Sequence, residues 1–450
     1  MADTTTATTT FQANGKKHEL AVVLRYAPFV SGKNSEEIAL VNENINLFEY
    51  TNKLNGLMMT GRIVYDDNRG QLGKIFSFPT VFCHFVYHML DQSKVGDVGK
   101  EDVIKGTDVS HTFLVDNMRI LSRNGNIVKY EIKLVSSFWF NFTRHVSYTT
   151  YPAEKPVTKI VEDIFSDAGL PINKKTFDDL KSSTSIQYIS GGTETPISSF
   201  SYLMKRSFYI YENRDKSLKF VVYDEQKNEF RLFDLFSDGY YLGHFPIVIN
   251  PSKSALEGLF QASDVEMRSV VKGGNTDGLF SMAPRRFFTY DIGPGASGEI
   301  KQFDVKAEDI TQFIDNKSPD NQFPQRYDPI MKAPTYLRTG SEWGNDEDMY
   351  AEMVNTFMNV DALIVNIDGD PRHKPASVFT LELRDKDNAI EGEEVSSLKD
   401  QKTRYMQLRG TWISTSVRHI IVPRDDVLGG KVKSNVCLSR NFVNKEEDKS

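Results

Sequence analysis

The sequence is poor in cysteine, which excludes a fold held together by several disulfides. Cys83 and Cys437 are the only two among 450 residues, so at most one bridge can form. A reducing, cytoplasmic folding environment is the simpler expectation. An excess of positive charge is also absent, because the formal net charge is -7. The chain therefore has no general electrostatic reason to bind nucleic acid or an anionic membrane surface, although a local basic face is compatible with this charge.

Two kinds of apolar segment are missing. The start, MADTTTATTTFQANGKK, has no apolar stretch behind a basic one, so we expect no secretory signal and interpret residues 1–16 as a mobile tail. The longest apolar run, Ile75–Leu90, is too short for a membrane helix and contains a proline and two histidines. We therefore expect a soluble protein without stable membrane insertion.

The common catalytic motifs are absent as well. The sequence has no G-x-S-x-G elbow, Walker loop or Cys/His nucleophile pattern. Gly293–Gly298 fits G-x-G-x-x-G, and residues 286–292 before it have the character of a strand. A dinucleotide site needs a helix after the last glycine, yet residues 299–305 have no helical stripe. We interpret the motif as a turn.

His84 and His88 fall on one face of their segment, whether it is a helix or a strand. The spacing H-F-V-Y-H lacks the glutamate of H-E-x-x-H, and no carboxylate or cysteine pattern in the nearby sequence completes a metal site. We interpret them as paired structural histidines on a barrel strand. With 61 carboxylates, paired acids for glycoside hydrolysis can always be imagined, but their separation in space cannot be read from the sequence.

The stretch VNIDGDPRHKPASVFTLEL, residues 365–383, contains the densest polar cluster. Asp368, Asp370 and His373 stand between two apolar runs, where they form either a reactive site or the loop of a hairpin. The neighbouring glycine and prolines favour the hairpin loop. On this interpretation, Asp370→Ala and His373→Ala leave the protein nearly unchanged unless the loop faces a neighbouring subunit. We expect no catalytic residue, no cofactor and no metal.

The patterning indicates mainly strands with a few helices. Aromatic residues make up 12% of the chain, and alternating apolar and charged residues on both sides of Arg123–Asn126 predict a hairpin with an Asn-Gly turn. Apolar residues at helical spacing predict a helix over residues 156–169, a second from Pro196 with Thr195 as N-cap, and a third over 346–358. Strands are predicted again from residue 363 onward, and Glu391–Glu394 is interpreted as a solvated loop.

Three segments resemble the baseplate hub proteins of contractile-tailed phages, a family of the T-even hub type that is related to the spike-base domains of type VI secretion. They are IVYDDNRGQLGKIFSFPT at 63–80, the passage from 118 to 169 containing RNGN and PVTKIVEDIFSDAG, and YMQLRGTWISTSVRHII at 405–421 followed by KSNVCLSRN at 433–441. A loop upstream of the last segment, residues 369–375, is similar to one that precedes a strand in such hubs.

This resemblance implies an α+β, mainly β fold. It implies a first tube-like antiparallel β-barrel domain at residues 17–150, a middle α+β domain at 151–250 and a second such barrel at 251–280 and 346–445. Residues 281–345 match no pattern of the family; they are rich in Pro, Gly, Asp and Asn with weak periodicity, and we interpret them as a loop-rich insertion.

The resemblance also implies a structural function without enzymatic activity. Two tube-like barrels per chain give a homotrimer pseudo-sixfold symmetry, which adapts a threefold central spike to a sixfold tail tube. The partners it implies are the spike, tail tube or tube-initiator proteins and baseplate wedge proteins, with DNA only passing through the channel. The implied location is the virion tail baseplate, after assembly in the host cytoplasm. The alternatives are a virion-associated enzyme that degrades cell wall or glycan, and a carbohydrate-binding β-sandwich module, for which aromatic residues are the only support.

Overall fold

The computed structural model describes residues 9–13, 15–26, 36–54, 56–78, 80–91, 103–144, 149–179, 188–189, 195–204, 209–210, 216–217, 219–234, 242–249, 260–267, 285–290, 300–305, 335–339, 363–383, 410–425 and 429–440. In these ranges the first strands are β1 (Thr9–Ala13), β2 (Lys16–Tyr26), β3 (Glu36–Leu40), β4 (Ile45–Lys53), β5 (Thr60–Asp67), β6 (Val81–Leu90), β7 (Val109–Asn124), β8 (Ile127–Ser136) and β9 (Thr150–Tyr151). They are followed by β10 (Tyr188–Ile189), β11 (Tyr209–Ile210), β12 (Lys216–Ser217), β13 (Lys219–Asp224), β14 (Glu229–Asp234), β15 (His244–Ile249) and β16 (Phe260–Met267). The remaining strands are β17 (Arg285–Tyr290), β18 (Ile300–Val305), β19 (Thr335–Thr339), β20 (Leu363–Asp368), β21 (Val378–Leu383), β22 (Gly410–Asp425) and β23 (Gly429–Arg440). The helices are α1 (Trp139–Arg144), α2 (Val157–Asp167), α3 (Lys174–Asp179), α4 (Pro196–Met204) and the 3₁₀ turns η1 (Asn42–Asn44) and η2 (Leu72–Ser77).

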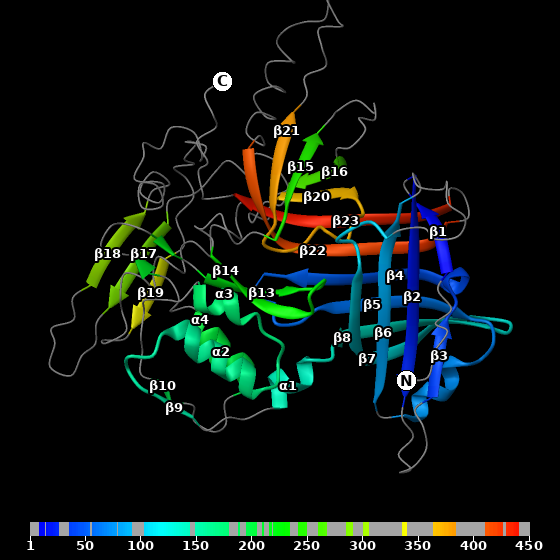
Figure 1. Ribbon diagram of the computed structural model, residues 1–450, viewed down its shortest axis with the longest axis horizontal. Helices are drawn as coiled ribbons and strands as arrows, with labels where there is room; N and C mark the ends of the chain where they lie inside the picture. The colour runs from blue at the N-terminus through cyan, green and yellow to red at the C-terminus, as the bar shows by residue number, and fades with distance from the viewer. Residues whose placement is uncertain are drawn as a thin grey trace, which may run out of the picture.

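One large sheet dominates the structure (Figure 1). Its order is β1-β23-β20-β16-β15-β21-β22-β4-β5-β8-β7-β6-β2-β3, with additional pairings of β1 with β2 and of β23 with β22. Followed through these extra pairings, the strands close into two rings. The first ring is β22-β4-β5-β8-β7-β6-β2-β1-β23, and the second ring is β23-β20-β16-β15-β21-β22. The mainly β fold class is therefore confirmed.

The long hairpin β22–β23 belongs to both rings. At its start β22 pairs with β21, where Ile413 lies opposite Val378. Beyond a register shift between Ser414 and Ser416, β22 pairs with β4 instead, from Ser416 opposite Lys53 to Ile421 opposite Phe48. A β-bulge of this kind bends a strand and increases its twist, which lets one strand leave one ring and enter the other.

Most pairings are antiparallel, as expected, but β1 pairs in parallel with β23 in the first ring, and β15 has parallel partners in the second. β15 pairs in parallel with both β16 and β21. The expectation of an antiparallel barrel is therefore wrong at β15. Parallel neighbours need long connections, and β21, one of the partners of β15, begins only at Val378, far enough along the chain to allow this.

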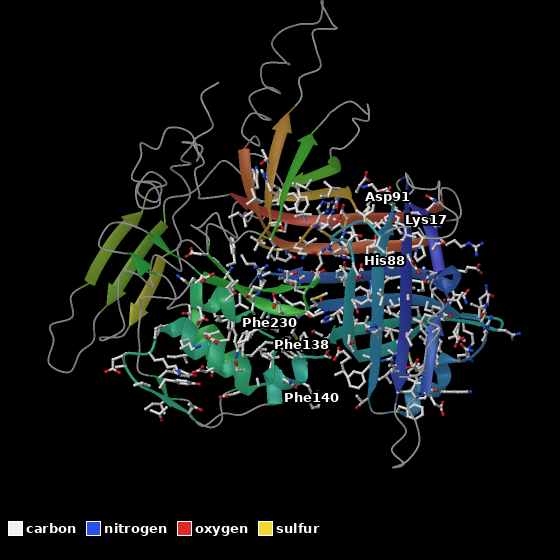
Figure 2. All side chains as sticks on the ribbon, viewed as in Figure 1. Lys17, His88, Asp91, Phe138, Phe140 and Phe230 are labelled. Carbon is white, nitrogen blue, oxygen red and sulfur yellow. The ribbon has the colours of Figure 1, made fainter. Side chains whose placement is uncertain are left out.

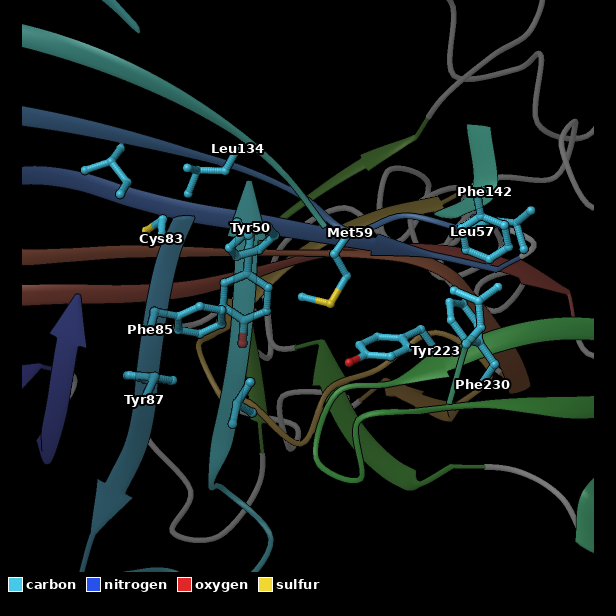
Figure 3. Packing of buried hydrophobic residues seen from close by; sticks show 14 of the residues in the cluster. Tyr50, Leu57, Met59, Cys83, Phe85, Tyr87, Leu134, Phe142, Tyr223 and Phe230 are labelled. Carbon is cyan, nitrogen blue, oxygen red and sulfur yellow. The ribbon is translucent and has the colours of Figure 1, made fainter. Parts of the chain in front are cut away.

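The core of the first ring follows from alternating residues. In β6, the residues Val81, Cys83, Phe85, Tyr87 and Met89 are buried. The ring centroid of Phe85 lies 5.0 Å from that of Phe48 and 5.2 Å from that of Tyr50, and Figure 3 shows Tyr50 and Phe85 packed together. The predicted hairpin is confirmed as β7 and β8, and Gly125 supplies the positive φ of 59° in its turn.

The helices pack beside β13 and β14 (Figure 1). The predicted stripe of α2 is buried and consists of Val157, Ile160, Val161, Ile164 and Phe165. The helix ends at Asp167, and Gly169 just beyond it has a φ of 70°, while the amides of Gly169 and Leu170 donate to the carbonyls of Ser166 and Phe165.

The second predicted helix is α4, with Phe200 and Leu203 buried. The ring centroids of Phe138 and Phe230 lie 5.8 Å apart where the helices meet the β13–β14 hairpin (Figure 2).

Several segments differ from what the sequence predicted, and others lie outside the described residues. Residues 9–13, placed by the sequence in an N-terminal tail, form β1 and pair with β2. Within residues 281–345, interpreted as a loop-rich insertion, β18, β17 and β19 form a separate sheet in that order. The helix expected at 346–358 and the acidic loop at 391–394 lie outside the described residues. Among the residues described, no helix is both long and apolar enough to cross a membrane.

Candidate functional site: a buried polar junction

The polar segment 369–377 does not form a hairpin loop. The strands on either side of it, β20 and β21, do not pair with each other; β20 pairs with β16 and β23, whereas β21 pairs with β15 and β22. The segment crosses from one side of the second ring to the other, and Asp370, His373, Lys374 and Ser377 are buried. The interpretation as a polar surface turn is therefore wrong, because turn residues in the sequence do not reveal whether a loop is covered.

Asp370 and Arg372 form the first part of this segment's polar network. Arg372 Nη2 lies 2.6 Å from Asp370 Oδ2, Arg372 Nε lies 2.9 Å from Oδ1, and the amide of Arg372 also donates to Oδ1 at 2.9 Å. Burial alone raises the pKa of Asp370, but the hydrogen bonds and positive charge of Arg372 outweigh it and hold that pKa below its usual value. Asp368 of the predicted cluster is exposed at the end of β20 and takes no part in this pairing.

His373 and His419 form the second part. His419 Nε2 donates to the carbonyl of His373 at 3.1 Å, Ser434 Oγ lies 3.2 Å from His419 Nδ1, and the Asp370 amide donates to Ser434 Oγ at 3.3 Å. The His373 ring packs at 4.9 Å from the ring of Phe245. Burial lowers the pKa of His373 to about 3 and that of His419 to about 4, so both are neutral at pH 7.

A third part comes from the β13–β14 hairpin, whose tip we call the 224–228 turn. Lys374 Nζ donates to Asp224 Oδ1 at 2.6 Å and to Gln226 Oε1 at 2.7 Å. Arg231 Nη1 lies 3.3 Å from the second oxygen of Asp224. The turn itself requires the left-handed conformation of Asn228, whose φ is 52°. The second ring thus holds the 224–228 turn through Lys374.

The first ring holds the same turn from another side. Asn52 Nδ2, on β4, donates to Glu225 Oε1 and to the carbonyl of Tyr223, each at 2.8 Å. His111 Nδ1, on β7, lies 3.1 Å from the hydroxyl of Tyr223, and Gln226 donates to the carbonyl of Gly106. The 224–228 turn, segment 369–377 and these residues of the first ring together form a buried polar junction. Figure 3 shows Tyr223 extending from β13 toward Met59 in the core.

Glu225 is the most perturbed acid of the junction. Its side chain is buried, and burial raises its pKa to about 7 against the smaller opposing effects of Asn52 and Lys374. In the described part of the chain, Glu225 Oε2 has no hydrogen-bond partner. This residue could not be identified from the sequence, since Asp224–Asn228 has only the composition of a polar turn.

The other candidates from the sequence have structural partners. His84 and His88 lie on one face of β6, where His84 Nδ1 is 3.1 Å from Thr112 Oγ1 and His88 Nε2 is 2.7 Å from Glu19 Oε2. Cys83 and Cys437 are free thiols. Across the described residues, no group of three or more His, Cys, Asp or Glu is arranged to hold a metal ion.

The glycine-rich motif at 293–298 lies outside the described residues, and the residues after it form strand β18. A dinucleotide site needs a helix at that position, so the interpretation of residues 299–305 as non-helical is confirmed. In the junction itself, cations and carboxylates bind one another and the histidines are neutral. This arrangement is suited to holding parts of the chain together.

Comparisons with known proteins agree with this picture at the level of fold. No protein-family model and no curated protein matches the chain. The tail protein of Neisseria meningitidis MC58 aligns with 94% of this chain and 97% of its own length, at 9% identity and a TM-score of 0.50. The 43 kDa tail protein of prophage MuSo2 from Shewanella oneidensis has 9% identity, coverages of 94% and 100%, and a TM-score of 0.49. A chain of the half-lidded Francisella PdpA-VgrG complex has 9% identity and a TM-score of 0.49, with 98% of this chain covering 60% of that one. This chain thus shares its fold with a phage tail protein, that of Neisseria meningitidis MC58, in agreement with the resemblance to baseplate hubs.

Proposed function

We propose that the chain is a structural hub protein at the centre of a phage tail baseplate. In this proposal it acts as a homotrimer in which each chain contributes two tube-like barrels, so that three chains present six. The resulting pseudo-sixfold surface adapts a threefold spike to the sixfold tail tube. Such an adaptor works through shape and stable contacts and needs no catalytic residue.

The observation that carries this proposal is the pair of strand rings joined by β22 and β23. A symmetry adaptor needs two similar units fixed relative to each other within one chain, and a shared hairpin supplies a rigid connection. The fold likeness to the Neisseria tail protein supports it further, because it extends over 97% of that protein.

The proposed function assigns the chain to three domains and an insertion. Residues 17–150 form the first tube-like domain, 151–250 the middle domain, 251–280 and 346–445 the second tube-like domain, and 281–345 an insertion. β15, at residues 244–249, joins the second tube-like domain because it pairs with β16 and β21. The middle domain connects the two through the buried polar junction.

The proposed partners are the central spike, tail tube or tube-initiator proteins and baseplate wedge proteins. DNA passes through the channel without being bound, and the net charge of -7 is compatible with a channel that repels it. The protein is then part of the virion and is assembled in the host cytoplasm.

Native mass spectrometry and negative-stain imaging of the purified protein, alone and with the spike, test the proposal. A threefold ring with a central channel is the expected result. A chain that stays monomeric at micromolar concentration with the spike present contradicts it. A monomer that cleaves peptidoglycan supports the alternative of a virion-associated enzyme.

A further inference from the structure

The 224–228 turn is the point at which three separate parts of the chain are tied together. It receives Lys374 from the second ring, Asn52 and Gly106 from the first ring, and Arg231 from its own hairpin. Release of this turn frees the tip of the β13–β14 hairpin from both rings, while the rings stay joined to each other through β22 and β23.

Glu225 lies at the centre of these contacts and is only half satisfied. Asn52 donates to Oε1 at 2.8 Å, while Oε2 is buried without a hydrogen-bond partner among the residues described. A neutral carboxyl tolerates this environment, whereas a carboxylate with an unsatisfied buried oxygen does not.

The charged and titratable groups around Glu225 do not compensate its charge. Lys374, from segment 369–377, lowers its pKa but is already bound to Asp224, whose carboxylate raises it. Besides burial, the negative charge of Glu225 raises the pKa of Tyr50 on β4 and of Tyr223 on β13. On the remaining sides, Arg231 of β14 is engaged with Asp224, and His111 of β7 has a pKa lowered by burial to about 3 and is neutral.

We propose that the 224–228 turn is a proton-controlled latch, in which neutral Glu225 keeps the turn docked between the two rings and ionised Glu225 loosens it. The latch is a property of this fold and does not depend on the proposed function as a baseplate hub. In a hub it gives the middle domain a way to change its attachment to the two barrels.

The direction of the effect follows from proton linkage. The pKa of Glu225 is about 7 with the turn docked and returns to its ordinary value of 4.5 when the turn is released. The docked state therefore binds the proton more tightly, and docking weakens as the pH rises from 4.5 to about 7, with no further loss above that. The contribution of Glu225 to the equilibrium for release increases about tenfold per pH unit in this window, or about 300-fold in total.

Hydrogen exchange measured by mass spectrometry between pH 5 and 8 tests the latch. After correction for the intrinsic exchange rate, peptides covering β13 and β14 are expected to lose protection as the pH rises to about 7 and then to level off. Peptides covering β2 serve as an internal reference, because opening there exposes buried His18, whose pKa is lowered by burial to about 4, which makes protection rise with pH instead. Protection of β13 and β14 that stays constant or rises with pH overturns the proposal.

Glu225→Gln separates the proton from the packing. It is nearly the same size as neutral Glu225, so the variant is expected to keep protection at its pH 5 level throughout. The matched control, Glu43→Gln at an exposed carboxylate in η1, is expected to retain the wild-type slope. A Glu225→Gln protein with the wild-type slope contradicts the latch.

If Glu225→Gln does not fold, carboxyl ¹³C NMR of the wild-type protein decides the matter. A carboxyl resonance that titrates near pH 7 and is shown by double labelling to neighbour Tyr223 or Asp224 supports the latch. If every glutamate titrates near its ordinary value, the latch is wrong.

Discussion

Lys374 Nζ lies 2.6 Å from Asp224 Oδ1, in an ion pair whose side chains are only 5% and 3% exposed. It joins a segment of the second ring to the β13–β14 hairpin, 150 residues earlier in the chain. Loss of one partner of such a pair leaves a buried charge without full compensation, and this costs more than the pair itself contributes.

Lys374→Met should therefore lower the free energy of unfolding by about 3–5 kcal/mol, because of the two cationic partners that Asp224 has among the described residues it keeps Arg231 alone. Urea denaturation followed by tryptophan fluorescence measures this. Lys227→Met on the same turn is the control, because Lys227 is exposed, and it should change stability by less than about 0.5 kcal/mol. Equal effects of the two substitutions would show that the ion pair contributes nothing specific.

His373→Ala is expected to destabilise the protein by about 2–5 kcal/mol, contrary to the expectation from the sequence that it has almost no effect. The imidazole is fully buried and packs against Phe245 and Phe379, so its removal leaves a cavity. Thermal unfolding measures the loss. Asp368→Asn, at the exposed end of β20 just before segment 369–377, serves as the control. A wild-type melting temperature for His373→Ala would contradict the burial of its side chain.

Burial could be predicted from the local sequence for some elements but not for segment 369–377. The stripe of α2 correctly predicted which side chains are buried, because the pattern reports a single element facing one core. Segment 369–377 has turn residues, but its burial is caused by strands β22 and β23 more than 35 residues away. Non-local packing of this kind leaves no periodic signal.

The closure of the strands into two rings could not be predicted from the sequence either. The pairing of Ser416–Ile421 with Phe48–Lys53 joins the two ends of the chain, and neither strand's pattern identifies its partner. The junction residues Asn52 and Glu225 were missed for the same reason, since a polar residue in a strand or a turn is ordinarily exposed. The resemblance to phage hubs predicted the fold class because it compares whole arrangements.

Acid should destabilise the protein through its buried histidines. Burial lowers the pKa of His18 and His419 to about 4 and that of His111 and His373 to about 3. In the unfolded chain these groups have their ordinary pKa of 6.5, so between pH 6.5 and the folded values the unfolded state binds more protons. The free energy of unfolding should therefore fall as the pH drops through this window, by roughly 1.4 kcal/mol per pH unit for each histidine.

Urea denaturation at half-unit steps from pH 7.5 to 4.5 measures this slope. His18→Gln should make it shallower by roughly one proton, because His18 bridges Tyr87 and the carbonyl of Ala13 in the neutral form. His244→Gln, at an exposed side chain, is the control and should leave the slope unchanged. A free energy of unfolding that is constant from pH 7.5 to 4.5 would contradict the burial of these imidazoles in their neutral form.

The shared hairpin should make the two rings unfold together. Trp412 lies at the end of β22 that pairs with the second ring, and Ile421 lies at the end that pairs with the first; both are buried. Trp412→Ala should cost about 3–5 kcal/mol and Ile421→Ala about 2–5 kcal/mol. Because either substitution weakens a strand that closes both rings, each variant should show one calorimetric transition shifted to lower temperature. Hydrogen exchange of β4 peptides in Trp412→Ala, and of β21 peptides in Ile421→Ala, should accelerate as well. If each substitution instead produces a second transition and accelerates exchange in its own ring alone, the rings are independent units and β22–β23 is a linker rather than a common wall.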